Sequence, residues 1–142
     1  MKILFWNIRG ISNFDSRLAL KDFCTSHNPL LIFISQLIVS FSTVPSCFWK
    51  SIHVTKFFVN NRDPLTLNLW ALCGADGEFV VRFTSSQCVV LESVCNNSKV
   101  YIVGVYASTY YLKRRQLWAD LTSLQNFYTA PWISVGDLNA VL

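Results

Sequence analysis

The sequence predicts an α+β fold with a large share of β-sheet, in which residues 1–142 form one domain or part of one. Two continuous apolar runs, residues 2–8 and 30–34, flank a segment with helical spacing, which is the pattern of a βαβ unit. Further along, short apolar segments alternate with turn sequences about every 8–12 residues, as successive strands do. The composition agrees: 52% of the 142 residues are hydrophobic and 14% are charged. Such a composition excludes a disordered chain and a coiled coil.

The N-terminal third predicts strand, helix and strand. Residues 2–8 form a short apolar run that ends at a turn and predicts a buried strand. A helix is expected over 16–27 with Asp15 or Ser16 as its N-cap. Its apolar face would hold Leu18, Ala19, Phe23, Cys24 and His27. Pro29 blocks the helix, and Leu30–Ile34 predicts a second buried strand followed by a loop.

The remainder predicts a strand meander, a helix and a last strand. The expected meander strands are Ile52–Asn60, Leu67–Cys73, Glu78–Thr84, Val89–Val94 and Val100–Tyr106. A helix follows over 113–128, and its expected apolar face comprises Leu117, Trp118, Leu121, Leu124, Gln125 and Tyr128. Trp132–Val135 is again a continuous apolar run and predicts a buried strand.

The charge pattern allows a polyanionic partner without requiring one. The net charge is +4, and the only run of basic residues is Lys113–Arg115. Arg114 and Arg115 are therefore candidates for weak nucleic-acid contacts. A solvated helix face explains the same run equally well.

Cysteine usage and hydropathy predict an intracellular protein that does not enter a membrane. The five cysteines form an odd set without a CxxC pair, which favours buried reduced thiols over zinc ligands or a disulfide framework. The first apolar run is too short for a signal peptide. The uncharged apolar stretch Leu30–Phe41 is shorter than the roughly 20 residues of a spanning helix.

Polar side chains follow three of the apolar strands. Asn7 and Gln36 stand at the ends of the first two strands, and Asp137 and Asn139 follow the last one. In an extended chain, Asp137 and Asn139 would point to the same side. An Asp and an Asn two residues apart can ligate a divalent metal or hold a phosphate oxygen or an attacking water. Capping of turns by Asn and Asp is the alternative explanation for each residue taken alone.

Several motifs, taken in order, resemble those of endonuclease/exonuclease/phosphatase domains, the DNase I-like metal-dependent phosphodiesterases. The longer ones are Trp6–Gly10, Ser35-Gln36, Val105–Ser108 and Gly136–Asn139. The motif sequences are most similar to those of the endonuclease region of plant non-LTR retrotransposons. Four further motifs resemble that region in the same order: Asn60–Asp63, Asn68–Trp70, Lys113–Trp118 and Pro131-Trp132.

The resemblance implies a fold, a cofactor and a site. The fold would be a two-sheet sandwich flanked by helices. Asn7 would help to position the scissile phosphate or the metal, Tyr106 would approach the phosphate, Asp137 would orient or deprotonate the attacking water, and Asn139 would hold the phosphate. The metal would be Mg²⁺, held chiefly by a Glu at the position of Gln36, and the partner would be nucleic acid. The four catalytic candidates are expected to converge with Gln36 at one edge of the sheets.

Two departures from the family pattern shape the functional hypothesis. Gln36 supplies only a dipole where the family has a carboxylate. The family domain continues to an Asp-His pair, whereas this chain ends at Leu142, and its histidines, His27 and His53, belong to the predicted helix and an early strand. We therefore expect a C-terminally truncated, catalytically impaired or inactive remnant of a retroelement endonuclease. An active phosphodiesterase and a small nucleic-acid or protein binding module are the alternatives. A half-fold would self-associate through exposed sheet edges, with Leu30–Phe41 as the expected aggregating segment.

Overall fold

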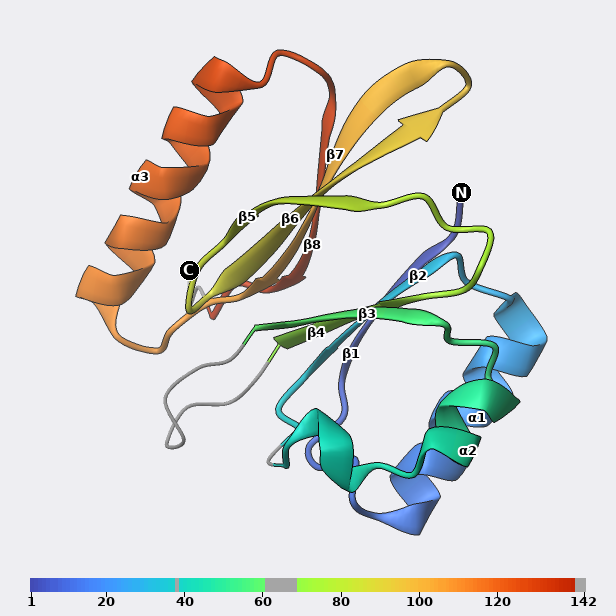
Figure 1. Ribbon diagram of the computed structural model, residues 1–142. Coiled ribbons are helices and arrows are strands. Elements are labelled where there is room, and N and C mark those ends of the chain that lie inside the picture. Colours follow the sequence, from blue (N-terminus) through green and yellow to red (C-terminus); the bar gives the residue numbers. More distant parts are fainter. Residues whose placement is uncertain (38, 61–68, 140–142) are drawn as a thin grey trace. The chain divides into compact units, whose positions relative to one another are not determined.

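The computed structural model describes residues 1–37, 39–60 and 69–139, which divide into two compact units, Met1–Gly77 and Glu78–Leu142. Each unit contains one mixed four-stranded sheet and its helices (Figure 1), so the predicted α+β class is confirmed. Two of the motifs noted above fall partly on residues 61–68, which lie outside the described residues.

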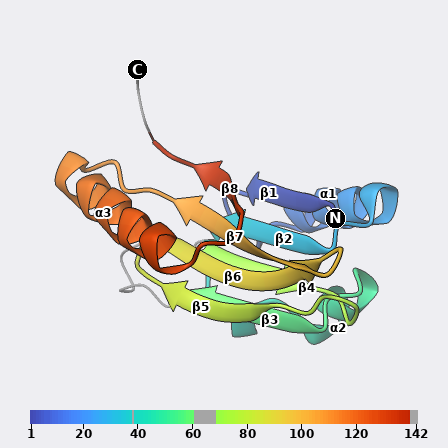
Figure 2. The ribbon, with the colours of Figure 1, turned by 90° about the horizontal axis from the view of Figure 1, so that it is seen from above.

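The sheet of the first unit has the strand order β1-β2-β4-β3. Its strands are β1 (Ile3–Asn7), β2 (Leu31–Ser35), β3 (Lys56–Asn60) and β4 (Leu69–Cys73). The helices are α1 (Phe14–His27), the 3₁₀ turn η1 (Phe41–Thr43) and α2 (Ser46–Ser51), and α1 and α2 cover one face of the sheet (Figures 1 and 2). On that face Leu20 and Trp49 from the helices pack in one core with Ile32, Ile34 and Trp70 from the strands.

The sheet of the second unit has the order β5-β6-β7-β8. Its strands are β5 (Val80–Thr84), β6 (Cys88–Cys95), β7 (Ser98–Tyr106) and β8 (Trp132–Asp137). The helix α3 (Tyr111–Phe127) packs Leu117 and Leu121 onto Val103 and Val105 of β7. This burial of two leucines anchors the helix to the sheet.

Both units contain the same crossover arrangement, a strand, a helix and a second strand parallel to the first. The pairs are β1 with β2 around α1, and β7 with β8 around α3. In each case an arginine from the first turn of the helix donates to two carbonyls of the loop before it. Arg17 donates to Ile11 (3.1 Å) and Ser12 (2.8 Å), and Arg114 donates to Ser108 (3.0 Å) and Thr109 (2.7 Å). The loops that follow β1 and β7 are therefore tied to their helices.

The burial of two predicted core strands differs from expectation. β2 is fully buried as predicted, but every residue of β1 is only partly buried, and β8 alternates between exposed and half-buried residues. Among the described residues β1 pairs only with β2, and β8 only with β7, so both are edge strands. The prediction that residues 2–8 and Trp132–Val135 are buried strands is thus wrong, because an edge strand keeps one side uncovered.

The prediction for the middle of the chain needs two corrections. The five expected strands do not form one meander, since β3 and β4 belong to the first sheet while β5, β6 and β7 belong to the second. The segment before β3 contains the short helix α2, which buries Trp49 and was expected to be loop, and the strand begins only at Lys56. His53 consequently lies in the turn after α2, at φ 58°, and not in a strand.

The predicted helices exist, but their caps and faces differ in detail. Asn13, rather than Asp15 or Ser16, is the N-cap of α1, and its side chain accepts the N–H of Asp15 (3.0 Å). Of the five residues predicted on the buried face of α1, only Cys24 is buried; Leu20 is the other buried residue. On α3 Leu117 and Leu121 are buried as predicted, whereas Trp118 is 44% exposed and Gln125 is exposed as well.

The strand within the segment expected to drive aggregation does not lie at a sheet edge. Within Leu30–Phe41, β2 lies between β1 and β4, and Leu37 is also buried. In the part of the chain that the structure describes, the sheet edges are β1, β3, β5 and β8. Self-association through such edges stays a prediction. No described helix is long and apolar enough to span a membrane.

A buried carboxylate joins three strands of the second unit. Glu92 of β6 accepts hydrogen bonds from Arg82 Nε (2.8 Å) and Tyr101 Oη (3.1 Å) and forms an ion pair with Lys99 (3.2 Å). Arg82 sits at the irregularity in the β5–β6 register between Val81 and Phe83. The Arg82 guanidinium, with smaller contributions from Lys99 and Tyr101, lowers the pKa of Glu92 from 4.5 to about 2, against the opposing effect of burial.

We expect Glu92→Gln to remove a pH-dependent part of the stability. Because the folded state lowers the pKa of this carboxyl, its contribution is complete above the unfolded value of 4.5 and is lost as the pH falls toward 2. In thermal melts the variant should show its largest decrease in melting temperature near neutral pH. Near pH 2 the decrease should almost vanish. Glu78→Gln, at an exposed carboxylate of the same unit, is the matched control. A difference between wild type and Glu92→Gln that stays constant with pH would contradict this assignment.

We expect Gly136→Ala to destabilise the second unit strongly. Gly136 lies in β8 with φ 151°, and a Cβ there would overlap the backbone carbonyl of Val105 on β7. A side chain would force the two parallel strands apart, at a cost of more than about 2 kcal/mol in the free energy of unfolding. Gly74→Ala is the control. Its Cβ would lie 3.2 Å from the carbonyl oxygen of His53, which is a tight contact but not an overlap like the one at Gly136. Equal denaturation midpoints for the two variants would show that the β7–β8 contact is looser than described.

Candidate functional site

In the first unit the candidate residues stand at the ends of two parallel strands. Asn7 is the last residue of β1 and pairs in register with Ser35, the last residue of β2. Ser35 is completely buried, and among the described residues neither its Oγ nor Asn7 Oδ1 has a hydrogen-bond partner. A buried polar atom without a partner costs about 1–3 kcal/mol. Two such atoms lie here on register partners, and each is an oxygen that can accept a hydrogen bond from a water or another polar group.

The backbone after these two strands holds Gln36 beside the end of β1. The N–H of Ile8 donates to Ser35 O (3.1 Å), and the N–H of Gly10 donates to Gln36 O (2.9 Å). Gln36 adopts a left-handed conformation with φ 58°, and so do Arg9 and Gly10 across from it. Both loops therefore turn sharply at the same level, which keeps Asn7 and Gln36 on neighbouring strand ends.

In the second unit the candidate residues stand at the equivalent place. Tyr106 ends β7, Asp137 ends β8, and the two residues are register partners. Their strands approach closely because Gly136 leaves no side chain against Val105. The N–H of Ala107 donates to Asp137 O (2.9 Å), so the pairing continues just beyond Tyr106.

Asn139 is held in place by two hydrogen bonds. Its N–H donates to Asp137 Oδ1 (2.9 Å), and its Nδ2 donates to Ala107 O (2.6 Å), while its backbone has φ 44°. The extended conformation assumed from the sequence therefore ends at Asp137, and a turn closed by the Asp137 side chain positions Asn139. The amide of Asn139 and one carboxylate oxygen of Asp137 are engaged in this turn.

Gln87 supports the loop after Tyr106, and nothing in the sequence pattern singled it out. Its backbone carbonyl accepts the N–H of Tyr106 (2.8 Å). Its buried side chain accepts the N–H of Ser108 (2.7 Å) and donates to Lys113 O (2.7 Å). Gln87 thereby joins β6, the β7–α3 loop and the start of α3. Only the tertiary structure reveals this role, because a Gln in a turn sequence is otherwise ordinary.

The two arginines proposed for nucleic-acid contact differ in their surroundings. Arg114 is half-buried and donates to the carbonyls of Ser108 and Thr109, so it also supports the loop after Tyr106. Arg115 is exposed on the first turns of α3. Tyr110 and Tyr111 beside it are 72% and 66% exposed, and Lys113 lies 5.9 Å from the ring centroid of Tyr110.

The structure thus forms two groups, each within one unit. Asn7, Ser35 and Gln36 lie together in the first, and Tyr106, Asp137 and Asn139 lie together in the second. Ser35 was not among the candidates, although a polar residue ending an apolar strand was a usable signal. That the two groups meet at one edge stays a prediction.

Among the described residues, the strand ends of the first unit offer no anionic oxygen to Mg²⁺. Among them there is no set of three His, Cys, Asp or Glu side chains placed to hold a metal. The oxygen donors at the strand ends of the first unit are the neutral side chains of Asn7, Ser35 and Gln36. A hard dication prefers anionic carboxylate oxygens. Gln36 therefore supplies no charge at the position where the resemblance places the metal ligand.

Comparison with known proteins supports the fold. No protein-family model and no curated protein sequence matches the chain. Among solved structures, a humanized TDP2 of D. rerio superposes with a TM-score of 0.71 at 16% identity, covering 98% of this chain and 66% of that one. D. rerio TDP2 complexed with a single-strand DNA product gives 0.68 at 15%, covering 99% and 61%. An AP endonuclease from Archaeoglobus fulgidus gives 0.69 at 13%, covering 99% and 58%.

These likenesses concern the fold alone, since the identities are low. The chain spans a little under two thirds of the length of the three structures. They are members of the endonuclease/exonuclease/phosphatase superfamily. The two mixed sheets with their helices therefore have the DNase I-like fold that the ordered motifs predicted.

Proposed function

We propose that this chain is a nucleic-acid phosphodiesterase domain of the endonuclease type, of non-LTR retroelement origin and intracellular, in a catalytically impaired form. The observation that carries the proposal is the placement of polar residues at in-register ends of parallel strands in both units, Asn7 with Ser35 and Tyr106 with Asp137. Strand ends deliver side chains to loops and clefts, where binding and catalytic groups concentrate.

The residues of the second unit suit the handling of a phosphate ester. Asp137 Oδ1 accepts the Asn139 N–H, which fixes the orientation of the carboxylate. The carboxylate can accept a proton from an attacking water, the role of a general base. The Tyr106 hydroxyl, next to it in register, is a donor type suited to a phosphate oxygen.

The first unit supports the impaired form of the activity. The family motif places the carboxylate that holds Mg²⁺ at Gln36, and this amide offers no charge to a dication. The unpartnered Asn7 Oδ1 and Ser35 Oγ still provide oxygens for a water or a weakly held ion. The retroelement origin is supported by the order of the short motifs, such as Lys113–Trp118 and Gly136–Asn139.

We expect little or no nicking of supercoiled plasmid DNA by this chain in Mg²⁺. Asp137→Ala removes the proposed base, and general-base assistance is typically worth about 10²–10⁴-fold. If the site is impaired, Asp137 provides no such assistance, so the wild type and the variant should nick the plasmid at the same background rate. Circular dichroism confirms that both proteins are folded. Robust nicking that Asp137→Ala abolishes would refute the impaired form and favour an active nuclease.

We expect Gln36→Glu to raise the affinity for Mg²⁺ by about tenfold or more, because it adds an anionic oxygen beside Asn7. Turnover should remain near background. Isothermal titration calorimetry with Mg²⁺ measures the affinity, and the plasmid assay measures turnover. Gln125→Glu, on the exposed side of α3, adds the same charge elsewhere and should leave the affinity unchanged. An equal gain in both variants would mean that general electrostatics, not a site at Gln36, attracts the ion.

A non-catalytic binding module is the second candidate, and one observation favours it. The start of α3 exposes Tyr110, Tyr111 and Arg115 together, with no acidic residue in the first turn of the helix. Exposed aromatic rings next to cationic side chains suit single-stranded nucleic acid. Binding of a labelled oligonucleotide without cleavage, in the same assays, would favour this candidate.

A further inference from the structure

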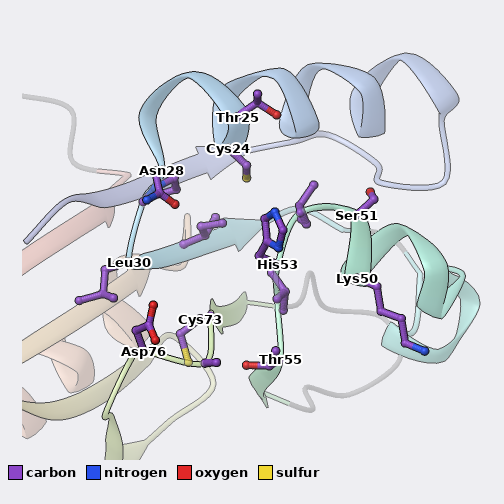
Figure 3. Close-up of a pocket in the computed structure, with 16 residues that line it drawn as sticks. Cys24, Thr25, Asn28, Leu30, Lys50, Ser51, His53, Thr55, Cys73 and Asp76 are labelled. Carbon is purple, nitrogen blue, oxygen red and sulfur yellow. The ribbon is translucent and has the colours of Figure 1, made fainter.

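The cavity around His53 in the first unit has a volume of about 640 Å³ (Figure 3). It lies between the last turn of α1, the end of α2, the turn before β3 and the turn after β4. Its lining carries Lys50 and Asp76, which are charges of opposite sign, and both side chains are exposed. Such a lining selects neither a cation nor an anion. The second unit, by contrast, exposes a surface on α3 whose charge has one sign.

α3 has one side packed on its sheet and another side that is open (Figure 1). Leu117 and Leu121 lie on the packed side. Tyr111, Arg115 and Trp118 stand at positions i, i+4 and i+7, and this spacing places them in one row along the helix surface, outside the packed side. All three are exposed, Tyr111 to 66% and Trp118 to 44%. We call these three residues the α3 row.

The side chains of the α3 row stabilise no other part of the described chain. None of the three makes a hydrogen bond, an ion pair or a ring contact with the described residues. A single exposed ring would need no explanation, because scattered apolar side chains are normal on protein surfaces. Two open rings with a cation between them are different, since they form a flat surface on which other rings can stack.

The charges on α3 favour an anionic partner for this row. Arg115 lies about one turn from each ring, and Lys113 is exposed in the first turn of the helix. The only acidic residue of α3 is Asp120, which stands five positions after Arg115 and therefore on another side of the helix. Its Oδ1 accepts a hydrogen bond from Gln116 Nε2 (2.8 Å). A polyanion that also carries flat rings matches both the rings and the charge of the row.

The distance between the two rings suits an unpaired strand. Seven residues of α-helix, from Tyr111 to Trp118, rise by about 10 Å. Three steps between stacked bases, at about 3.4 Å each, cover the same distance. The faces of unpaired bases are open to protein rings, whereas those inside a duplex are stacked on neighbouring base pairs. A short single strand can therefore contact both rings and place a phosphate at Arg115.

The row begins close to the candidate site of the second unit. Residues 107–110 connect Tyr106, the end of β7, to Tyr111, the first residue of α3. Arg114 holds this connection by donating to the carbonyls of Ser108 (3.0 Å) and Thr109 (2.7 Å). A strand that lies on the row can thus continue toward Tyr106.

We propose that the α3 row of Tyr111, Arg115 and Trp118 binds single-stranded nucleic acid, with unpaired bases stacked on the two rings and a phosphate paired with the Arg115 guanidinium. A guanidinium can donate two parallel hydrogen bonds to phosphate oxygens. The inference rests on the proposed function and deepens it, because it names the unpaired strand as the form of nucleic acid that the chain holds. It also extends the exposed group at the start of α3 by two helical turns.

Three labelled probes test the proposal by fluorescence anisotropy in EDTA, where no metal-dependent cleavage occurs. They are an oligothymidylate of eight nucleotides, an abasic strand with the same phosphates, and a duplex of twelve base pairs. We expect the oligothymidylate to bind at least about fivefold more tightly than the other two, because it alone offers open bases. Equal affinity for the abasic strand, or tighter binding of the duplex, would overturn the inference and leave the proposed function standing. No binding of any probe would refute both.

Variants of the rings separate stacking from general attraction. Tyr111→Ala and Trp118→Ala should each weaken oligothymidylate binding at least about fivefold and leave the affinity for the abasic strand unchanged, whereas Tyr111→Phe should bind like the wild type. Phe127→Ala is the matched control, because it removes an α3 ring that is 77% exposed but lies outside the row. Equal losses in all three alanine variants would show that the row is not the site. Tyr111 is open enough for its variants to fold even if Trp118→Ala loosens the helix.

The salt dependence of binding tests the part assigned to Arg115. One phosphate contact on a single strand contributes about 0.7 to the slope of log affinity against log salt concentration. Arg115→Gln should lower the slope of the oligothymidylate by about that amount. Lys21→Gln removes an exposed cation of α1 and should leave the slope unchanged. The same slope in wild type and Arg115→Gln, or the same decrease in both variants, would contradict a phosphate contact at this residue.

Discussion

The in-register pairing of two parallel strands around a crossover helix determines most of what matters in this structure. It occurs once in each unit, β1 with β2 and β7 with β8. In a parallel pair the carboxyl ends lie at the same edge, so whatever residues end the two strands become neighbours. For this reason Asn7 meets Ser35, and Tyr106 meets Asp137. In the second pair Gly136 is required, because any side chain there would overlap the Val105 carbonyl.

Around these strand ends the chain uses side chains to secure loops. Arg17 and Arg114 hold the loops after β1 and β7 by their carbonyls, and Gln87 adds two hydrogen bonds in the second unit. By contrast, Asn7 Oδ1 and Ser35 Oγ are left without partners among the described residues. The loops at these strand ends are thus held by side chains, whereas two buried polar atoms beside them remain unsatisfied within the described chain.

The electrostatic character of the two groups is unequal, and this inequality underlies the proposed impairment. The second unit offers the carboxylate of Asp137, whose orientation Asn139 fixes. The first offers only neutral oxygens, because Gln36 replaces the acidic residue of the family pattern.

The sequence by itself determined the α+β class, most of the strands and helices, and the order of motifs that indicated the DNase I-like fold. Apolar runs, turn residues and helical spacing are local signals, and they are sufficient for the class and for most of the elements. The DNase I-like fold, in contrast, was implied by the resemblance of the ordered motifs to a known family. The local signals could not distinguish the central strand β2 from the edge strands β1 and β8, because all three begin as apolar runs. Nor could they assign β3–β4 and β5–β7 to different sheets, or reveal Ser35, Gln87 and the cavity around His53. Those features depend on which segments pair across many residues of chain, and tertiary contacts alone decide that pairing.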